Sequence, residues 1–158
     1  MTTISAFLIA DDVTDSFSSA QLIELLDDSV NPTGTLNATL RDKIIARVNG
    51  EASSLTSGKL IFPLQVDDSD ADNIKATLVG FALDMFEYYA MKDKPHILQA
   101  FTGVQDGYHR AVQWLEAVRD GKATIGTSKT VPGAEARNAA VETTSHQGTF
   151  ERKRMRGW

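Results

Sequence analysis

The residues with the strongest chemical character lie at the C-terminal end of the chain. Residues 150–158 read FERKRMRGW, in which four cationic side chains lie between two aromatic ones. Phe and Trp are costly to leave in water, and Arg and Trp are enriched where protein interfaces bind tightly. The pattern predicts an anchor for another macromolecule, the alternative being an exposed solubilising tail; the predicted partner-binding residues are Phe150, Arg152, Lys153, Arg154, Met155, Arg156 and Trp158.

The charge of the chain divides it into two unlike parts. Residues 1–121 contain nine Lys and Arg against eighteen Asp and Glu, whereas residues 122–158 contain seven against three. The net charge of -5 argues against a generic nucleic-acid binder, because neutralising phosphates requires a basic surface. An acidic body followed by a basic arm predicts a compact domain whose arm binds something outside it.

A dense acidic run precedes the middle of the chain and could suggest a calcium site. It lacks the spaced oxygen ligands, the mid-loop Gly and the terminal Glu of an EF-hand. Carboxylates are also favourable at the N-terminus of a helix. We therefore interpret the run as the start of a helix with a solvated face, formed by Asp67, Asp68, Asp70 and Asp72.

Residues with the spacing of an active site are not found in the sequence. The three histidines, His96, His109 and His146, form no HExxH or other ligand pattern, and no Gly-rich phosphate-binding loop occurs. His109 is followed by Arg110 but has no acid or hydroxyl near it at the spacing of a nucleophile. We expect no catalytic residues, no metal, no cofactor and no enzymatic activity.

Composition restricts the class of protein further. The chain of 158 residues has no Cys, which excludes disulfides, thiolate metal sites and cysteine nucleophiles. Its N-terminal apolar run is short and no Lys or Arg precedes it, so it does not resemble a signal peptide. No run approaches the roughly 20 apolar residues of a membrane span. These observations predict a soluble protein made in a cytoplasm.

Hydrophobic periodicity predicts helices along the first 121 residues. Ser18 and Gln21 have the spacing of a capping box for a short helix ending near residue 28, and a longer helix is expected over 36–57. Residues 60–66 read as an extended, packed link around Pro63. The most apolar helix is expected over 69–91, as a central helix or also a subunit interface, and the last over 103–120, capped by Gly121.

The residues that follow Gly121 are low in large apolar side chains and show no sustained period, which is typical of a loop or arm. The predicted fold is all-α: a four-helix bundle with a long extended C-terminal arm. The predicted domains are a helical domain over residues 1–121, which the resemblance described next implies to be of the connector type, and the arm over residues 122–158.

The ordered set of these segments resembles a family of Mu-like phage and prophage virion proteins. The resemblance runs from SSAQLIELLDD through SGKLIFPLQV and FALDMFEYYAM to YHRAVQWLEAVRDGKATIG, and the C-terminal MRGW is similar to the family's closing stretch. It departs at Phe62, where the family has Tyr, and in the loop of residues 34–37. The matching positions in the last helix and its exit are Tyr108, Ala111, Trp114, Leu115, Gly121, Lys122 and Gly126.

The resemblance implies a head-tail connector, also called an adaptor or head-completion protein. Such a protein is a structural subunit of a ring, expected to be a dodecamer, that lies beneath the portal in the neck of the virion and is assembled in the host cytoplasm. The implied partners are the portal and a tail-proximal neck or tail terminator protein. Genomic DNA would pass through the lumen without specific binding, and no membrane is involved.

Two further expectations concern binding. The subunits are expected to associate through the helices around residues 36–55 and 69–91, in a heterologous contact that closes into a ring. The arm is expected to pack on another chain rather than on its own body. The alternative function is a small helical DNA-binding or packaging-regulatory protein that uses the basic C-terminal tail on phosphates.

Overall fold

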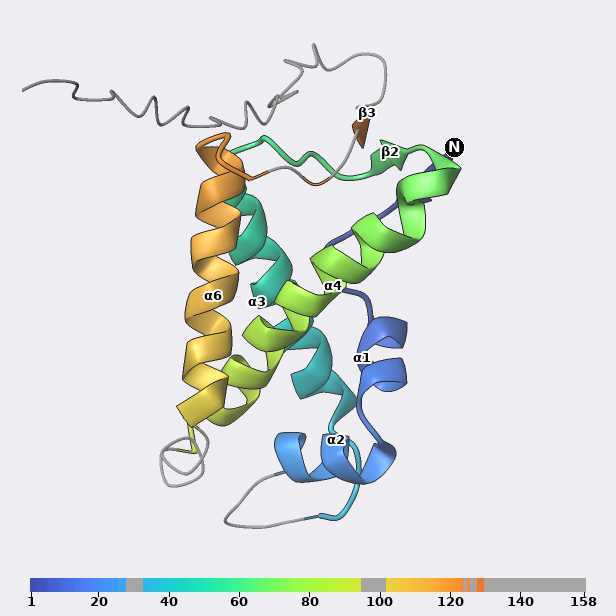
Figure 1. Ribbon diagram of the computed structural model, residues 1–158. Helices are drawn as coiled ribbons and strands as arrows, with labels where there is room; N and C mark the ends of the chain where they lie inside the picture. The colour runs from blue at the N-terminus through green and yellow to red at the C-terminus, as the bar shows by residue number, and fades with distance from the viewer. Residues whose placement is uncertain (28–32, 95–101, 124, 126–127, 130–158) are drawn as a thin grey trace, which may run out of the picture.

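The computed structural model describes residues 1–27, 33–94, 102–123, 125, 128 and 129. In these residues the chain forms five helices and one three-stranded antiparallel sheet (Figure 1). The protein is mostly helical, as predicted. The four predicted helices are all present, but the all-α description is incomplete, because a first short helix and a small sheet are added. The elements in chain order are β1 (Thr2–Ile4), α1 (Ala10–Ser16), α2 (Ser19–Leu26), α3 (Ala38–Thr56), β2 (Leu64–Val66), α4 (Asp68–Met91), α6 (Thr102–Arg119) and β3 (Ser128–Lys129).

Helix α1 was not predicted, because its seven residues are too few to show a helical period. It begins where the Asp12 carboxylate accepts a hydrogen bond of 3.1 Å from the backbone N–H of Ile9. Val13, completely buried, attaches the helix to the core. A carboxylate that accepts from an otherwise unpaired N–H stabilises the start of a helix.

The capping box predicted for the next helix is confirmed. The Ser18 hydroxyl accepts from the Gln21 N–H at 3.3 Å, and the Gln21 side chain accepts from the Ser18 N–H at 2.9 Å. Helix α2 ends at Leu26 with Asp27 as its C-cap, close to the predicted end near residue 28, and it buries Leu22 and Leu26.

Helix α3 also follows the sequence closely. The Asn37 side chain accepts from the Leu40 N–H at 3.0 Å and caps its start. The helix ends at Thr56; its C-cap, Ser57, adopts a left-handed conformation with φ 47°, and Gly58 follows with φ 76°. Glycine adopts this conformation without steric cost, which explains why the helix stops here.

The sheet forms from strands too short to show alternation in the sequence. Strand β2 lies in the centre and pairs antiparallel with β1 and with β3. Leu64 and Val66 of β2 are buried, and Gln65 between them donates to the Thr3 hydroxyl of β1 at 2.9 Å. The extended, packed link predicted around Pro63 therefore continues into a strand.

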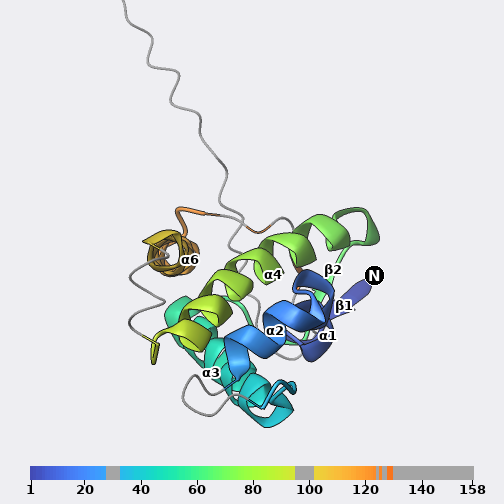
Figure 2. The same ribbon diagram turned by 90° about the horizontal axis from the view of Figure 1, so that it is seen from below.

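Helix α4 is central, which confirms one of the roles that its apolar composition predicted. It contacts α2, α3, α6 and β1. In both ribbon views it crosses the middle of the molecule, with α6 on one side and α1 on the other (Figures 1 and 2). Its buried residues include Ile74, Leu78, Met85 and Phe86. Burial on several faces follows from this position between neighbours.

The end of α6 has the geometry that Gly121 predicted. Gly121 has φ 72°, its N–H bonds to the Val118 carbonyl at 3.1 Å, and the Lys122 N–H bonds to the Ala117 carbonyl at 2.7 Å. These two bonds form a Schellman motif. The predicted glycine cap is therefore confirmed.

The described part of the predicted arm packs on its own body. Ile125 is buried in the core and β3 pairs with β2, so the expectation that residues beyond Lys122 pack only on another chain is wrong for these positions. Residues 130–158 lie outside the described part of the chain, and the division into domains at residue 121 stays a prediction.

Candidate functional site

The predicted partner-binding residues lie outside the described residues. This applies to all seven: Phe150, Arg152, Lys153, Arg154, Met155, Arg156 and Trp158. The candidate sites that can be built from geometry are therefore on the body. They are an acidic edge, a basic pocket and a polar cluster that joins three helices.

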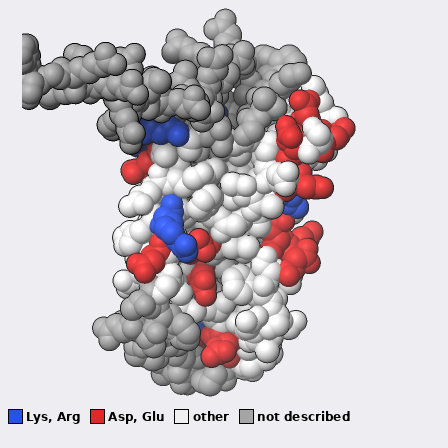
Figure 3. Space-filling view, viewed as in Figure 1, with Lys and Arg blue, Asp and Glu red and all other residues white. Residues whose placement is uncertain are grey.

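The acidic edge is formed by α1 and the start of α4. The two elements lie together, because the Lys75 ammonium of α4 pairs with the Asp12 carboxylate of α1 at 3.0 Å. Figure 3 shows Asp and Glu side chains gathered along this edge. Two of its carboxylates pair with cations, Asp12 with Lys75 and Asp68 with the N-terminal ammonium. The seven carboxylates of the edge belong to Asp11, Asp12, Asp15, Asp67, Asp68, Asp70 and Asp72.

Asp68 shows how the helix start uses part of this charge. Its carboxylate accepts from the N-terminal ammonium at 2.8 Å and from the Thr2 hydroxyl at 2.7 Å, and these bonds lower its pKa. Asp67 occupies the N-cap position, although its side chain makes no capping bond. The acidic run thus opens a helix, as interpreted from the sequence. Within the described residues, no three His, Asp or Glu side chains are grouped so that they could hold a metal ion.

The basic pocket lies between α2, the N-terminal half of α3 and the C-terminal end of α4. It has a volume of about 480 Å³. Its lining carries four cations and two carboxylates, which gives a formal charge of +2 in a chain whose total is -5. The charged lining residues are Lys43, Arg47, Lys92, Lys94, Asp27 and Asp93.

Two of these cations approach one aromatic ring. The guanidinium carbon of Arg47 lies 4.1 Å from the centroid of the Tyr89 ring, and the Lys92 ammonium lies 5.5 Å from it. The face of an aromatic ring attracts cations. The ring therefore brings two positive charges from different helices to one wall of the pocket.

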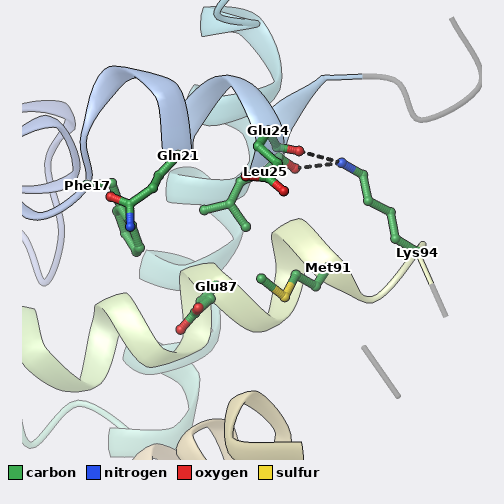
Figure 4. A pocket seen from close by; sticks show the side chains of 7 residues that line it. All are labelled: Phe17, Gln21, Glu24, Leu25, Glu87, Met91 and Lys94. Atoms are coloured by element: carbon green, nitrogen blue, oxygen red, sulfur yellow. Dashed lines mark hydrogen bonds between the residues drawn. The ribbon is translucent and has the colours of Figure 1, made fainter. Parts of the chain in front are cut away.

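Lys94 lies between the basic pocket and a smaller cavity of about 210 Å³ (Figure 4). Its ammonium donates to the carbonyls of Glu24 and Leu25 at 3.1 and 3.0 Å, at the end of α2. These carbonyls have no partner within an isolated helix, so the lysine acts as a C-terminal cap supplied by another element. Phe17, Leu25 and Met91 give the smaller cavity an apolar wall.

A polar cluster joins α3, α4 and α6 beside the basic pocket. The Glu51 carboxylate of α3 accepts a hydrogen bond from Tyr89 of α4 and another, of 2.7 Å, from Tyr108 of α6. Burial and the bond to Glu51 raise the pKa of Tyr89, and the same causes raise the pKa of Tyr108. Tyr88 stacks on Tyr108, with centroids 4.2 Å apart. A single carboxylate thus links three helices of the body.

Residues 8–143 match the family model described as Bacteriophage Mu, Gp36. This chain belongs to the Bacteriophage Mu Gp36 family. The match covers most of its length and identifies it as a protein of Mu-like phages. No curated protein and no solved structure matches it.

The residues that form these surfaces of the Gp36-family chain could be predicted only in part from its sequence. Arg47 and Glu51 lie off the apolar face that the helical period over 36–57 predicts, whereas the structure places both against Tyr89. Their spacing of four residues puts them on one face, and that was the available signal. Among the described helices, none is both long and apolar enough to cross a bilayer.

Proposed function

We propose that this Gp36-family chain is the head-tail connector, or adaptor, subunit of a Mu-like phage. In this role it forms a ring beneath the portal and joins the capsid to the tail, in the neck of the virion, without catalysing a reaction. The observation that carries the proposal is the family match over residues 8–143. The order of segments in the sequence, which resembles connector proteins of such phages, supports the choice of role.

The charge of the body suits a channel for DNA. With eighteen carboxylates against nine cations in residues 1–121, the body as a whole repels phosphates. A lumen of this sign would let the genome pass without binding to the wall. The basic pocket is the local exception, and its use is considered below.

The C-terminal tip is proposed to bind the portal. Burying one aromatic side chain contributes roughly 1.5–3 kcal/mol, whereas an exposed ion pair contributes at most about 1 kcal/mol. We therefore expect Trp158→Ala to weaken portal binding more than Lys153→Ala. The cations would set the approach and the register, and several arms in one ring would multiply the effect of each loss.

Complementation of connector-deficient heads with purified protein tests the proposal. A chain without residues 150–158 is expected to keep its folded body, checked by circular dichroism, and to lose the joining of filled heads to tails. Full restoration of infectivity by this shortened chain would contradict the role of the tip. Failure of the full-length chain to restore infectivity would contradict the connector role itself.

Assembly is tested separately by native mass spectrometry with and without portal protein. We expect a ring, with twelve subunits, in which each chain uses two different surfaces; the portal can act as the template for it. A stable twofold dimer as the only assembly would contradict this expectation. If the chain instead binds duplex DNA with an affinity that falls steeply with salt, the DNA-binding alternative is favoured.

A further inference from the structure

We propose that the basic pocket receives the acidic edge of a second copy of this chain. The inference rests on the proposed function, because it names the surfaces by which neighbouring subunits of the ring would join. It is carried by the opposite charges of two surfaces that a single chain presents at the two ends of α4.

The pocket has cations that its own carboxylates do not neutralise. Within the described residues, Lys43 and Lys92 form no ion pair, and Lys94 is bound to carbonyl groups of α2. Asp27 is engaged by backbone N–H groups of Thr33 and Gly34, at 2.9 and 2.7 Å. The pocket therefore favours an anionic group from outside the chain.

Stabilisation of helix ends does not account for this arrangement. Lys92 and Lys94 follow the C-terminus of α4, where cations are favourable. Lys43 and Arg47 lie inside α3, more than a turn from either end, and gain nothing from that effect. Arg47 and Lys92 converge at the Tyr89 ring, and Lys43 lines the same pocket, an arrangement of like charges that an added carboxylate would stabilise.

The acidic edge of another copy fits the pocket better than the chain's own C-terminal tip does. The tip is cationic and would be repelled, whereas the edge carries seven carboxylates. Apolar contact is also offered, because Leu40 lines the pocket and remains 38% exposed, and Leu36 nearby in the chain is 37% exposed. Exposed apolar side chains beside charged ones are typical of interfaces.

The positions of the two surfaces determine the kind of assembly. Helix α4 has 24 residues and is therefore about 36 Å long, with the acidic edge at its start and the basic pocket at its end. When the pocket of one copy binds the edge of the next, the assembly still has one unoccupied pocket at one end and one unoccupied edge at the other. Such a heterologous contact continues until it closes as a ring.

The test is a complementary exchange of charges in the full-length protein. Lys43→Glu with Lys92→Glu changes the formal charge of the pocket lining from +2 to -2. Asp11→Lys, Asp15→Lys and Asp72→Lys change exposed positions of the acidic edge; counted with its two nearby cations, the formal charge of the edge changes from -5 to +1. Self-association is measured by sedimentation velocity at low and at high salt, together with circular dichroism to verify the fold.

We expect each set of substitutions to weaken self-association at least about tenfold, because attraction becomes repulsion across the contact. The chain that carries all five substitutions should regain self-association, since the charges of both surfaces are then reversed. The control, Lys59→Glu with Lys122→Glu, changes the net charge by the same amount as the pocket substitutions at exposed positions outside both surfaces and should leave association unchanged.

Several results would overturn the inference. A wild-type chain that stays monomeric at its highest attainable concentration in low salt is one, and unchanged association in the pocket variant is another. If the pocket variant self-associates normally but no longer binds duplex DNA or heads, the occupant is a phosphate or another virion protein. If the variant with all five substitutions regains self-association but the wild-type chain fails to join heads to tails, this contact is supported and the connector role is rejected, so the two failures are distinguishable.

Discussion

Replacing Glu51 by Ala should destabilise the body through all three of the helices that its carboxylate joins. The substitution removes the bonds that Tyr89 and Tyr108 donate and leaves both hydroxyls without this acceptor. A hydrogen bond to a charged group contributes about 1.5–3 kcal/mol when well shielded. Tyr89 is 8% exposed but Tyr108 is half-buried, so water can replace part of the loss. We therefore expect the free energy of unfolding to fall by about 2–4 kcal/mol.

Urea denaturation followed by circular dichroism measures this change, with Tyr88→Phe as the control. The Tyr88 ring stacks in the same cluster, but its hydroxyl makes no hydrogen bond within the described residues, so the control should cost less than about 0.5 kcal/mol. A double-mutant cycle of Glu51→Ala with Tyr108→Phe should give a coupling of about 0.5–3 kcal/mol. A loss below about 0.5 kcal/mol for Glu51→Ala would refute the reasoning.

Burial raises the pKa of Asp84, with Arg110 opposing. Because its pKa is raised in the folded state, Asp84 contributes stability below its unfolded pKa of 3.8 and loses it as the pH rises through the folded pKa. Asp84→Asn should therefore stabilise the protein at pH 7 but not at pH 3. Urea titrations at the two pH values measure the difference. Gly50→Ala should raise the free energy of unfolding by about 0.5–1 kcal/mol, because its Cβ meets nothing within 4 Å. Gly107→Ala should gain less, because its Cβ would lie 3.2 Å from Asp84; equal gains in thermal melts would contradict this. Lys94→Met should cost about 0.5–2 kcal/mol by removing the cap of α2, and faster amide hydrogen exchange confined to α2 would locate the loss.

The parts of the fold that sequence reasoning predicted are those with local signals. The capping box at Ser18 and the glycine at position 121 act through neighbouring backbone groups, so their geometry can be inferred without knowing the tertiary structure. The long apolar period of α4 likewise indicated a central helix. These features depend on residues close together in the chain.

The parts that were missed depend on distant segments. Strand β2 has three residues and becomes a strand because β1 and β3, which are far apart in the chain, pair with it on either side. Arg47 and Glu51 look like exposed residues until α4 and α6 bring tyrosines to them. The basic pocket likewise needs α2, α3 and α4 in place. Periodicity reports which face of a helix is apolar but not which polar residues meet across helices.

Imaging of the neck of intact phage particles by cryo-electron microscopy tests the central claim most directly. The account predicts a ring of this Gp36-family chain directly beneath the portal, with the helical body in contact with neighbouring copies and residues 150–158 bound to the portal. Particles whose neck contains no density that fits the helices of this chain would contradict it.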